Sequence, residues 1–303
     1  MKIGILTFGR PLTKETEPPY ETKKIFEAAV ARGHETRIFC EPFFSFREHD
    51  GKTEIFYDNE PMPACDVFIA RTNFIEDFGL HSTTIDMLLS AGYKIINSNT
   101  LTSAATKNKL TRKLLLSQAG LPMPRSTIIR DVASVSTETQ VLGFPLVVKT
   151  PNGSGGRGVF LAENLETVLP IVDYLTITQK IPVLLEEFIN EAQGKDIRIF
   201  VAGDKIIAAM EREAKLGDIR SNIHAGGAGR PVELTETEKD IAIRATKAVG
   251  LEIAGVDIIR SKRGSLILEV NARPGFEGLE AATGVDVAGG IIEYVVGILG
   301  CRV

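Results

Sequence analysis

The sequence has few cysteines, few histidines and no long apolar run. Its three cysteines, Cys40, Cys65 and Cys301, form no Cys-x-x-Cys pair, which excludes a disulfide framework or a zinc knuckle and favours a reducing, cytoplasmic setting. The four histidines show no triad-like grouping. No segment approaches the ~20 apolar residues that span a bilayer, and Arg10 cuts short the first apolar run. Neither membrane residence nor a signal peptide is expected.

Basic charge is not in excess either. Lys and Arg number 35 against 39 Asp and Glu, a net charge of −4. Proteins that bind nucleic acid by releasing counterions are usually basic overall, so general nucleic-acid binding is not expected. With 303 residues, 44% hydrophobic and 24% charged, the chain has the composition of a folded protein of two or three domains.

The expected secondary structure differs between the first hundred residues and the rest of the chain. Strands alternate with helices over residues 1–98, a pattern that predicts a small α/β domain with a parallel sheet. A helix from about Leu101 to Gln118, with Asn99 as its N-cap, is expected to lead into the rest of the chain. Hairpins with turn signals then predict an α+β body. We divide that body into segments 99–182 and 183–303.

A glycine-rich loop from Gly153 to Gly158 matches the Gly-x-Gly-x-x-Gly pattern of dinucleotide sites. That motif needs a helix at its third glycine, but Val159 to Ala162 is typical of a strand. The pattern therefore favours a flap between two strands, whose backbone N–H groups could cover nucleotide phosphates. Lys149 directly before the flap and Lys107 on the connecting helix could add cations. The alternatives are a flexible hairpin tip and two solvated surface lysines.

Polar side chains interrupt two apolar strands near the C-terminus. Asp257 lies in one, and Glu269 and Asn271 lie two residues apart, hence on one face, in the next. The hairpin between the strands is expected to bring the three side chains together. Oxygen ligands with few carboxylates suit Mg²⁺, which takes further ligands from water and phosphates. The alternative is that a buried arginine, such as Arg198 or Arg273, pairs with the carboxylate.

A polar, glycine-rich stretch, Lys215 to Gly227, is too long for a plain connector, so it predicts a binding loop. A mobile solvated loop is the alternative, and His224 within it receives no role.

Together these residues resemble the ATP-grasp superfamily, and within it the RimK-type α-L-glutamate ligases. The resemblance covers Lys107 to Ile298 and is most specific in the segments Glu187 to Arg198, Arg220 to Gly227 and Ala254 to Gly278. It implies an α/β pre-ATP-grasp domain over 1–98, matched more loosely. An α+β ATP-grasp fold would follow, in which two subdomains clamp the nucleotide: 99–182 with the glycine flap and 183–303 with the metal site.

The resemblance also implies roles for individual residues. ATP would be bound by Lys107, Lys149, Gly155, Gly156, Glu187, Phe188, Asp196, Arg220, Ser221 and Asn222. Glu187 and Phe188 would form the adenine hinge, and Asp196 would bind the ribose hydroxyls. Asp257, Glu269 and Asn271 would hold two Mg²⁺ or Mn²⁺ ions. Arg220 and Arg273 would act in catalysis, although a small polar residue is expected in place of Arg273.

The activity implied is ATP-dependent addition of L-glutamate to an acceptor carboxylate, such as the C-terminus of a ribosomal protein. The reaction would pass through an acyl phosphate and give ADP and phosphate. One alternative is a glutamate ligase for a small coenzyme or an amino-acid carrier. Another is a regulatory module that binds ATP without a reaction. The oligomeric state, including a homo-oligomer, stays open.

Overall fold

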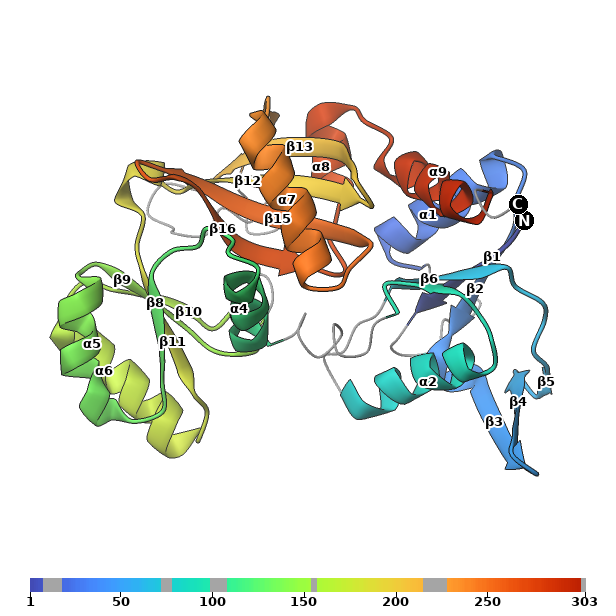
Figure 1. Cartoon of the computed structure of the whole chain (residues 1–303), viewed down its shortest axis with the longest axis horizontal. Coiled ribbons are helices and arrows are strands. Elements are labelled where there is room, and N and C mark those ends of the chain that lie inside the picture. The colour runs from blue at the N-terminus through green and yellow to red at the C-terminus, as the bar shows by residue number, and fades with distance from the viewer. Residues whose placement is uncertain (8–17, 72–77, 99–107, 154–156, 215–227, 301–303) are drawn as a thin grey trace.

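The structure is a computed structural model that describes residues 1–7, 18–71, 78–98, 108–153, 157–214 and 228–300, with only the backbone described at 78–81. Three parts follow one another along the chain, and the middle part lies at the far end from the N-terminal part (Figure 1). An α/β domain precedes two α+β subdomains, each built on its own sheet. The predicted fold class is confirmed.

The N-terminal domain is a parallel sheet, in the strand order β2-β1-β6-β7, with an antiparallel sheet β3-β4-β5 beside it. Gly4 on β1 allows the Phe68 ring of β6 to cross the sheet face, because a Cβ at Gly4 would lie 2.4 Å from that ring. The elements are β1 (Lys2–Thr7), α1 (Tyr20–Ala31), β2 (Glu35–Cys40), a 3₁₀ turn (Glu41–Phe43), β3 (Phe44–His49), β4 (Lys52–Tyr57), β5 (Glu60–Pro61), β6 (Val67–Arg71), α2 (Phe78–Ser90) and β7 (Ile95–Ile96).

The first subdomain is an antiparallel sheet, β10-β9-β11-β8, with helices on one face. Its elements are α4 (Lys109–Gln118), β8 (Ser126–Ile129), a 3₁₀ turn (Val132–Ser134), α5 (Val135–Leu142), β9 (Leu146–Lys149), β10 (Val159–Ala162), α6 (Leu165–Asp173), a π-helical turn (Tyr174–Thr178) and β11 (Val183–Glu187). Asn108 caps α4 by accepting hydrogen bonds from the N–H groups of Leu110 and Thr111, and its own backbone is extended. The helix predicted from Leu101 is therefore not continuous up to Gln118.

The second subdomain is an antiparallel sheet, β14-β13-β12-β15-β16, covered by α7. Its elements are a 3₁₀ turn (Asn190–Ala192), β12 (Lys195–Ala202), β13 (Lys205–Glu213), β14 (Ala228–Pro231), α7 (Glu236–Ala248), β15 (Ile253–Ser261), β16 (Gly264–Asn271), α8 (Glu277–Thr283) and α9 (Val287–Gly300). One boundary needs correction. β11, which we assigned to segment 183–303, lies between β9 and β8 in the first subdomain, because its apolar residues complete that core.

One hydrophobic core joins the N-terminal domain to the second subdomain. It combines Ile3, Ile25 and Val67 with Phe200 and Ile291, among others, and α9 lies along α1 (Figure 1). The N-terminal domain is therefore tied to the end of the chain as well as to its beginning. Among the described residues no single helix could span a membrane by length and composition, whereas α8 and α9, bent by 109°, pass that test as a pair.

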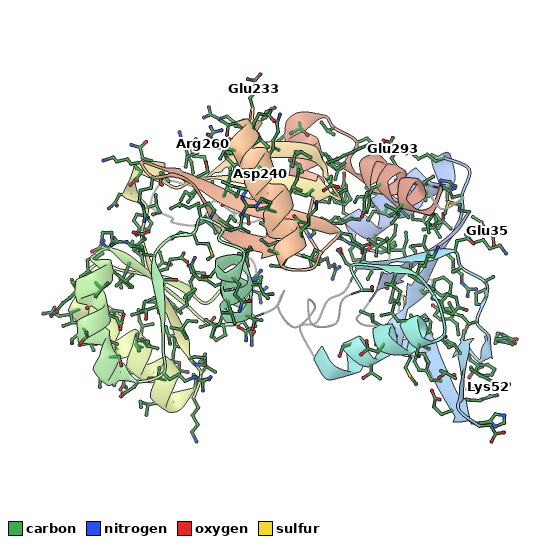
Figure 2. The ribbon with its side chains drawn as sticks, in the orientation of Figure 1. Glu35, Lys52, Glu233, Asp240, Arg260 and Glu293 are labelled. Carbon is green, nitrogen blue, oxygen red and sulfur yellow. The ribbon has the colours of Figure 1, made fainter. Side chains whose placement is uncertain are left out.

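Glu238, in the first turn of α7, should make stability depend on pH. Burial alone would raise its pKa, but hydrogen bonds from Arg260, the Thr235 backbone and Ser265 lower that pKa to about 2. Arg260 lies beside the start of α7, near Glu233 (Figure 2). A depressed carboxyl pKa contributes stability above the unfolded-state pKa of about 4.3, and that stability is lost as pH falls towards 2.

We therefore expect Glu238→Gln to lower the free energy of unfolding at pH 7 by roughly 3 kcal/mol, and to flatten its fall below pH 4.5. Urea melts between pH 2 and 7 measure both effects. Glu236→Gln, an exposed change in the same helical turn, is the control. Equal pH profiles for Glu238→Gln and the unmodified protein would contradict this assignment.

Candidate active site

A cavity of about 280 Å³ lies between the sheets of the two subdomains, with α4 at its side. Eight Lys or Arg and five Asp or Glu residues line it within the described chain, so cations exceed anions by three. These residues are Lys109, Arg112, Lys113, Lys149, Arg157, Lys195, Arg198 and Arg212, with Glu186, Glu187, Asp196, Asp257 and Glu269. Apolar side chains, including Met123, Phe188 and Ile189, form the rest of the wall. The cavity suits a ligand with an apolar ring and several negative charges.

Two lysines share one buried carboxylate on the first-subdomain side. Lys149 at the end of β9 and Lys113 on α4 each contact a different oxygen of Glu186, whose residue is only 3% exposed. Burial would raise the pKa of Glu186, but the two lysines lower it, so the carboxylate stays ionised. Burial lowers the pKa of Lys113, against the opposing attraction of Glu186. Glu186 therefore holds both ammonium groups at the cavity wall.

Aspartates and arginines alternate across three strands on the opposite wall. Asp196 of β12 faces Arg212 of β13, which donates to both of its oxygens at 2.7 Å. Arg198 of β12 faces Asp257 of β15 and also donates to both carboxylate oxygens, and Arg212 reaches Asp257 at 3.1 Å. Burial would raise the pKa of Asp257, but Arg198 and Arg212 lower it. Asp257 therefore stays charged, because two guanidiniums face it.

The predicted metal-binding side chains do lie together. Asp257 and Glu269 are directly opposite each other on β15 and β16, and the Asn271 amide donates to Asp257 at 3.4 Å. Arg112 of α4 donates to Glu269 at 3.0 Å. The arginine-pairing alternative is thus confirmed for Arg198, while nothing tests the metal assignment, which stays a prediction.

The donor chemistry nevertheless fits Mg²⁺, since two carboxylates and an amide supply only oxygens. Within the described ranges, no group of three or more His, Cys, Asp or Glu could hold a metal ion. The predicted set has two carboxylates and an amide, so it is not a group of that kind.

The glycine-rich segment connects two paired strands, β9 and β10, and the chain that follows Gly158 is a strand, not a helix. Lys149 pairs with Val159 in antiparallel register, which confirms the strand after the loop. Lys109 at the start of α4 donates from its Nζ to the Gly153 carbonyl at 3.2 Å and from its backbone N–H to Pro151 at 2.9 Å. α4 therefore contacts the strand end before the glycine-rich segment on one side and, through Arg112, β16 on the other.

Glu187 lies where the chain passes from the first subdomain to the second. Its carboxylate is occupied by contacts with other protein groups. The carboxylate accepts hydrogen bonds from the Arg125 backbone and side chain and from Arg263, which lower its pKa against the effect of burial. Beyond Phe188, the N–H of Ile189 has no hydrogen-bond partner among the described residues, and Ile189 lines the cavity.

The outcome for the predicted site residues is mixed. Lys149, Glu187, Phe188, Asp196, Asp257, Glu269 and Asn271 line one cavity. Arg273 lies outside that lining, on the side of the N-terminal domain. Lys107, Gly155, Gly156, Arg220, Ser221, Asn222 and His224 lie outside the described residues.

Sequence reasoning missed Glu186, Lys109, Arg112, Lys113 and Arg212. The signal that could have found Glu186 was a charged residue inside the apolar run of β11.

Comparison with known proteins agrees with this geometry. The model of the RimK-like ATP-grasp domain matches residues 106–295. The chain belongs to the RimK-like ATP-grasp family. It is 36% identical to a probable α-L-glutamate ligase 2 of Shewanella amazonensis, over all of this chain and 97% of that protein. It is 37% identical to a probable α-L-glutamate ligase of Chromohalobacter salexigens, over 97% and 95% of the two chains.

Solved structures confirm the ATP-grasp fold. The ATP-grasp ligase PsnB complexed with minimal precursor superposes with a TM-score of 0.75 at 24% identity, covering 97% of this chain and 98% of that one. A RimK domain ATP-grasp protein from Sphaerobacter thermophilus gives a TM-score of 0.70 at 19% identity, covering 97% and 99%. Family membership makes the chain an ATP-dependent ligase that forms carbon–nitrogen bonds.

The two-lysine contact with Glu186 yields a test of the cavity. Lys149→Ala should raise the apparent KM for ATP by about tenfold or more, because a charge-assisted contact to phosphate is lost, while Lys113 still neutralises Glu186. NAD should not bind, since the flap leads into a strand. Steady-state kinetics and calorimetry measure the two effects. Lys239→Ala, at an exposed position on α7, should change neither, and saturable NAD binding would contradict the flap assignment.

Proposed function

We propose that this chain joins the α-amine of L-glutamate to an acceptor carboxylate through an acyl phosphate, with release of ADP and phosphate. The observation that carries the proposal is the cavity, whose cations come from both subdomains and, within the described part of the chain, exceed its anions by three. Glutamate as the amine substrate is supported by the two curated relatives, both probable α-L-glutamate ligases. As acceptor we propose a protein C-terminus, such as that of a ribosomal protein.

The ends of the cavity suit different parts of ATP. The Ile189 N–H, for which the described residues offer no acceptor, lies beside the apolar wall and suits the edge of adenine. Lys149, Lys109 and Arg198 suit the phosphates, since ammonium and guanidinium groups stabilise anionic phosphoryl oxygens. Asp196 would bind the ribose hydroxyls if its carboxylate accepted hydrogen bonds from them as well as from Arg212. Lys107, Arg220, Ser221, Asn222 and the glycines at 155 and 156 remain part of this proposal from the sequence.

Asp257, Glu269 and Asn271 would hold two Mg²⁺ ions, with Mn²⁺ as a substitute. Bound divalent ions would neutralise charge on the transferred phosphoryl group. Because Arg198 and Arg212 neutralise Asp257 in this structure, those arginines would be released towards the phosphates when metal binds. Asp257 would then be neutralised by the two arginines in the empty site and by metal in the loaded site.

Metal-site variants test this assignment. Glu269→Gln and Asn271→Ala should each abolish ligase turnover, with a loss of at least about a hundredfold, while nucleotide binding weakens only moderately. Product assays and calorimetry with ATP measure the two effects. Glu213→Gln, on an exposed side chain in the same subdomain, is the matched control. Full turnover in Glu269→Gln would remove Glu269 from the metal site.

Oxygen labelling tests the reaction. An acceptor labelled with ¹⁸O in its carboxylate should transfer one labelled oxygen to phosphate, because that oxygen attacks the γ-phosphorus and leaves with it when the amine displaces phosphate. ADP should be the nucleotide product. Mass spectrometry of the released phosphate measures the transfer. Formation of AMP and pyrophosphate, or of unlabelled phosphate alone, would contradict the acyl phosphate.

A screen of acceptors separates the remaining alternatives. Labelled L-glutamate incubated with peptides and with small metabolite carboxylates should label a peptide C-terminus if the acceptor is a protein. Label in a coenzyme or an amino-acid carrier would support that alternative. ATP binding without any turnover would support the regulatory module.

A further inference from the structure

Two arginines meet at the boundary between the N-terminal domain and the second subdomain. Arg71 ends β6, and Arg273 follows β16 by two residues. Arg71 is only 4% exposed, and its guanidinium contacts the Pro274 carbonyl at 3.3 Å. Its charge and that of Arg273 act on one another. The arginine pair therefore belongs to a contact between two parts of the molecule.

The charge of this pair is not balanced within the described residues. Glu21 is the one carboxylate that acts on both arginines, and its nearer oxygen lies 3.8 Å from Arg71, too far for a hydrogen bond. Its other oxygen accepts from the Phe276 N–H at 3.3 Å. The Arg71 Nε is buried without a hydrogen-bond partner, and no partner is found for the Arg273 side chain in the ranges described. One positive charge is left over.

Such an arrangement opposes stability. Burial and the neighbouring Arg273 lower the pKa of Arg71 to about 9, and a buried donor without an acceptor is destabilising because it has lost its hydrogen bonds to water. Unsatisfied buried groups are rare in native proteins and often mark a site that a ligand completes. The ligand that satisfies two guanidiniums is an anion, and a carboxylate fits their forked donors best.

The position of the pair is fixed firmly beside the proposed metal site. Gly255 on β15 lies opposite Asn271 and lets Pro274 pack onto the strand, since a Cβ there would lie 2.6 Å from the Pro274 ring. Asn97 of the N-terminal domain donates to the carbonyls of Ile253 and Ala272. The backbone on both sides of Arg273 is thus held, and a ligand at the pair would lie next to Asn271.

We propose that Arg71 and Arg273 form the subsite for a carboxylate of the amino-acid substrate, one that does not react. The proposal rests on the function proposed above. Two guanidiniums stabilise the charge of a carboxylate and so weaken it as a nucleophile, which suits a spectator group and not the carboxylate that attacks ATP. L-Glutamate has such a group, and its amine would lie towards Asn271, where the acyl phosphate would form.

The test compares Arg273→Ser with the unmodified full-length chain. Arg273→Ser should raise the melting temperature of the ligand-free protein, because it removes like-charge repulsion. It should also lower the affinity for L-glutamate at least about tenfold. Affinity is measured by calorimetry with Mg²⁺ and a non-hydrolysable ATP analogue, and KM by turnover with the acceptor found in the screen. Arg71→Met, of similar volume, should behave likewise. Arg244→Ser, at an exposed helix position, should change neither quantity.

Analogues identify the carboxylate. L-Glutamine lacks the side-chain carboxylate and the α-amide of L-glutamate lacks the other, so the penalty of Arg273→Ser should vanish for the analogue that lacks the bound group. Equal L-glutamate affinity and KM in Arg273→Ser and the unmodified chain, or a lowered melting temperature in both variants, would overturn the proposal. A raised KM for the acceptor alone would overturn it in favour of the acceptor. If the unmodified chain turns over no L-glutamate, the proposed function itself fails.

Discussion

Neutralisation of buried charge in the cavity is the constraint on which the rest of the structure depends. Glu186 holds Lys113 and Lys149, and Asp257 holds Arg198 and Arg212. Removing one partner of such a pair leaves a buried charge that costs several kcal/mol. The strands must therefore keep their register, because a slip by one residue would turn each charged side chain into the core. The chemistry of the site and the pairing of the sheets constrain each other.

The two subdomains are connected by polar contacts and by α4, whose Leu116 lies in the apolar core of the second subdomain. Arg112 runs from α4 to Glu269, and Glu187 accepts from Arg125 and Arg263, which come from different subdomains. Polar links of this kind can exchange partners at low cost, whereas an apolar interface resists separation. The second subdomain and the N-terminal domain also share apolar residues in one cluster.

Positive charge is in excess where anions are expected to bind. The cavity has three more cations than anions among the described residues, and the Arg71–Arg273 pair has one carboxylate for two guanidiniums. Neither excess helps the empty protein fold, since like charges repel and burial removes their hydration. Sites that accept such a penalty are commonly those that a substrate completes. Under the proposed function, the nucleotide would bind in the cavity that Asn271 lines and the amino acid at the arginine pair that follows it in the chain.

The sequence by itself determined the fold class, the flap and the grouping of Asp257, Glu269 and Asn271, because strand periodicity and hairpin spacing are local properties. The same local pattern predicts that the glycine loop is not a dinucleotide site. The tertiary structure alone decided which charges meet. Glu186 reaches Lys113 across 73 residues of chain, Arg112 reaches Glu269 across 157 and Arg71 reaches Pro274 across 203. Such pairings depend on how the sheets stack, and no short window of sequence contains that information.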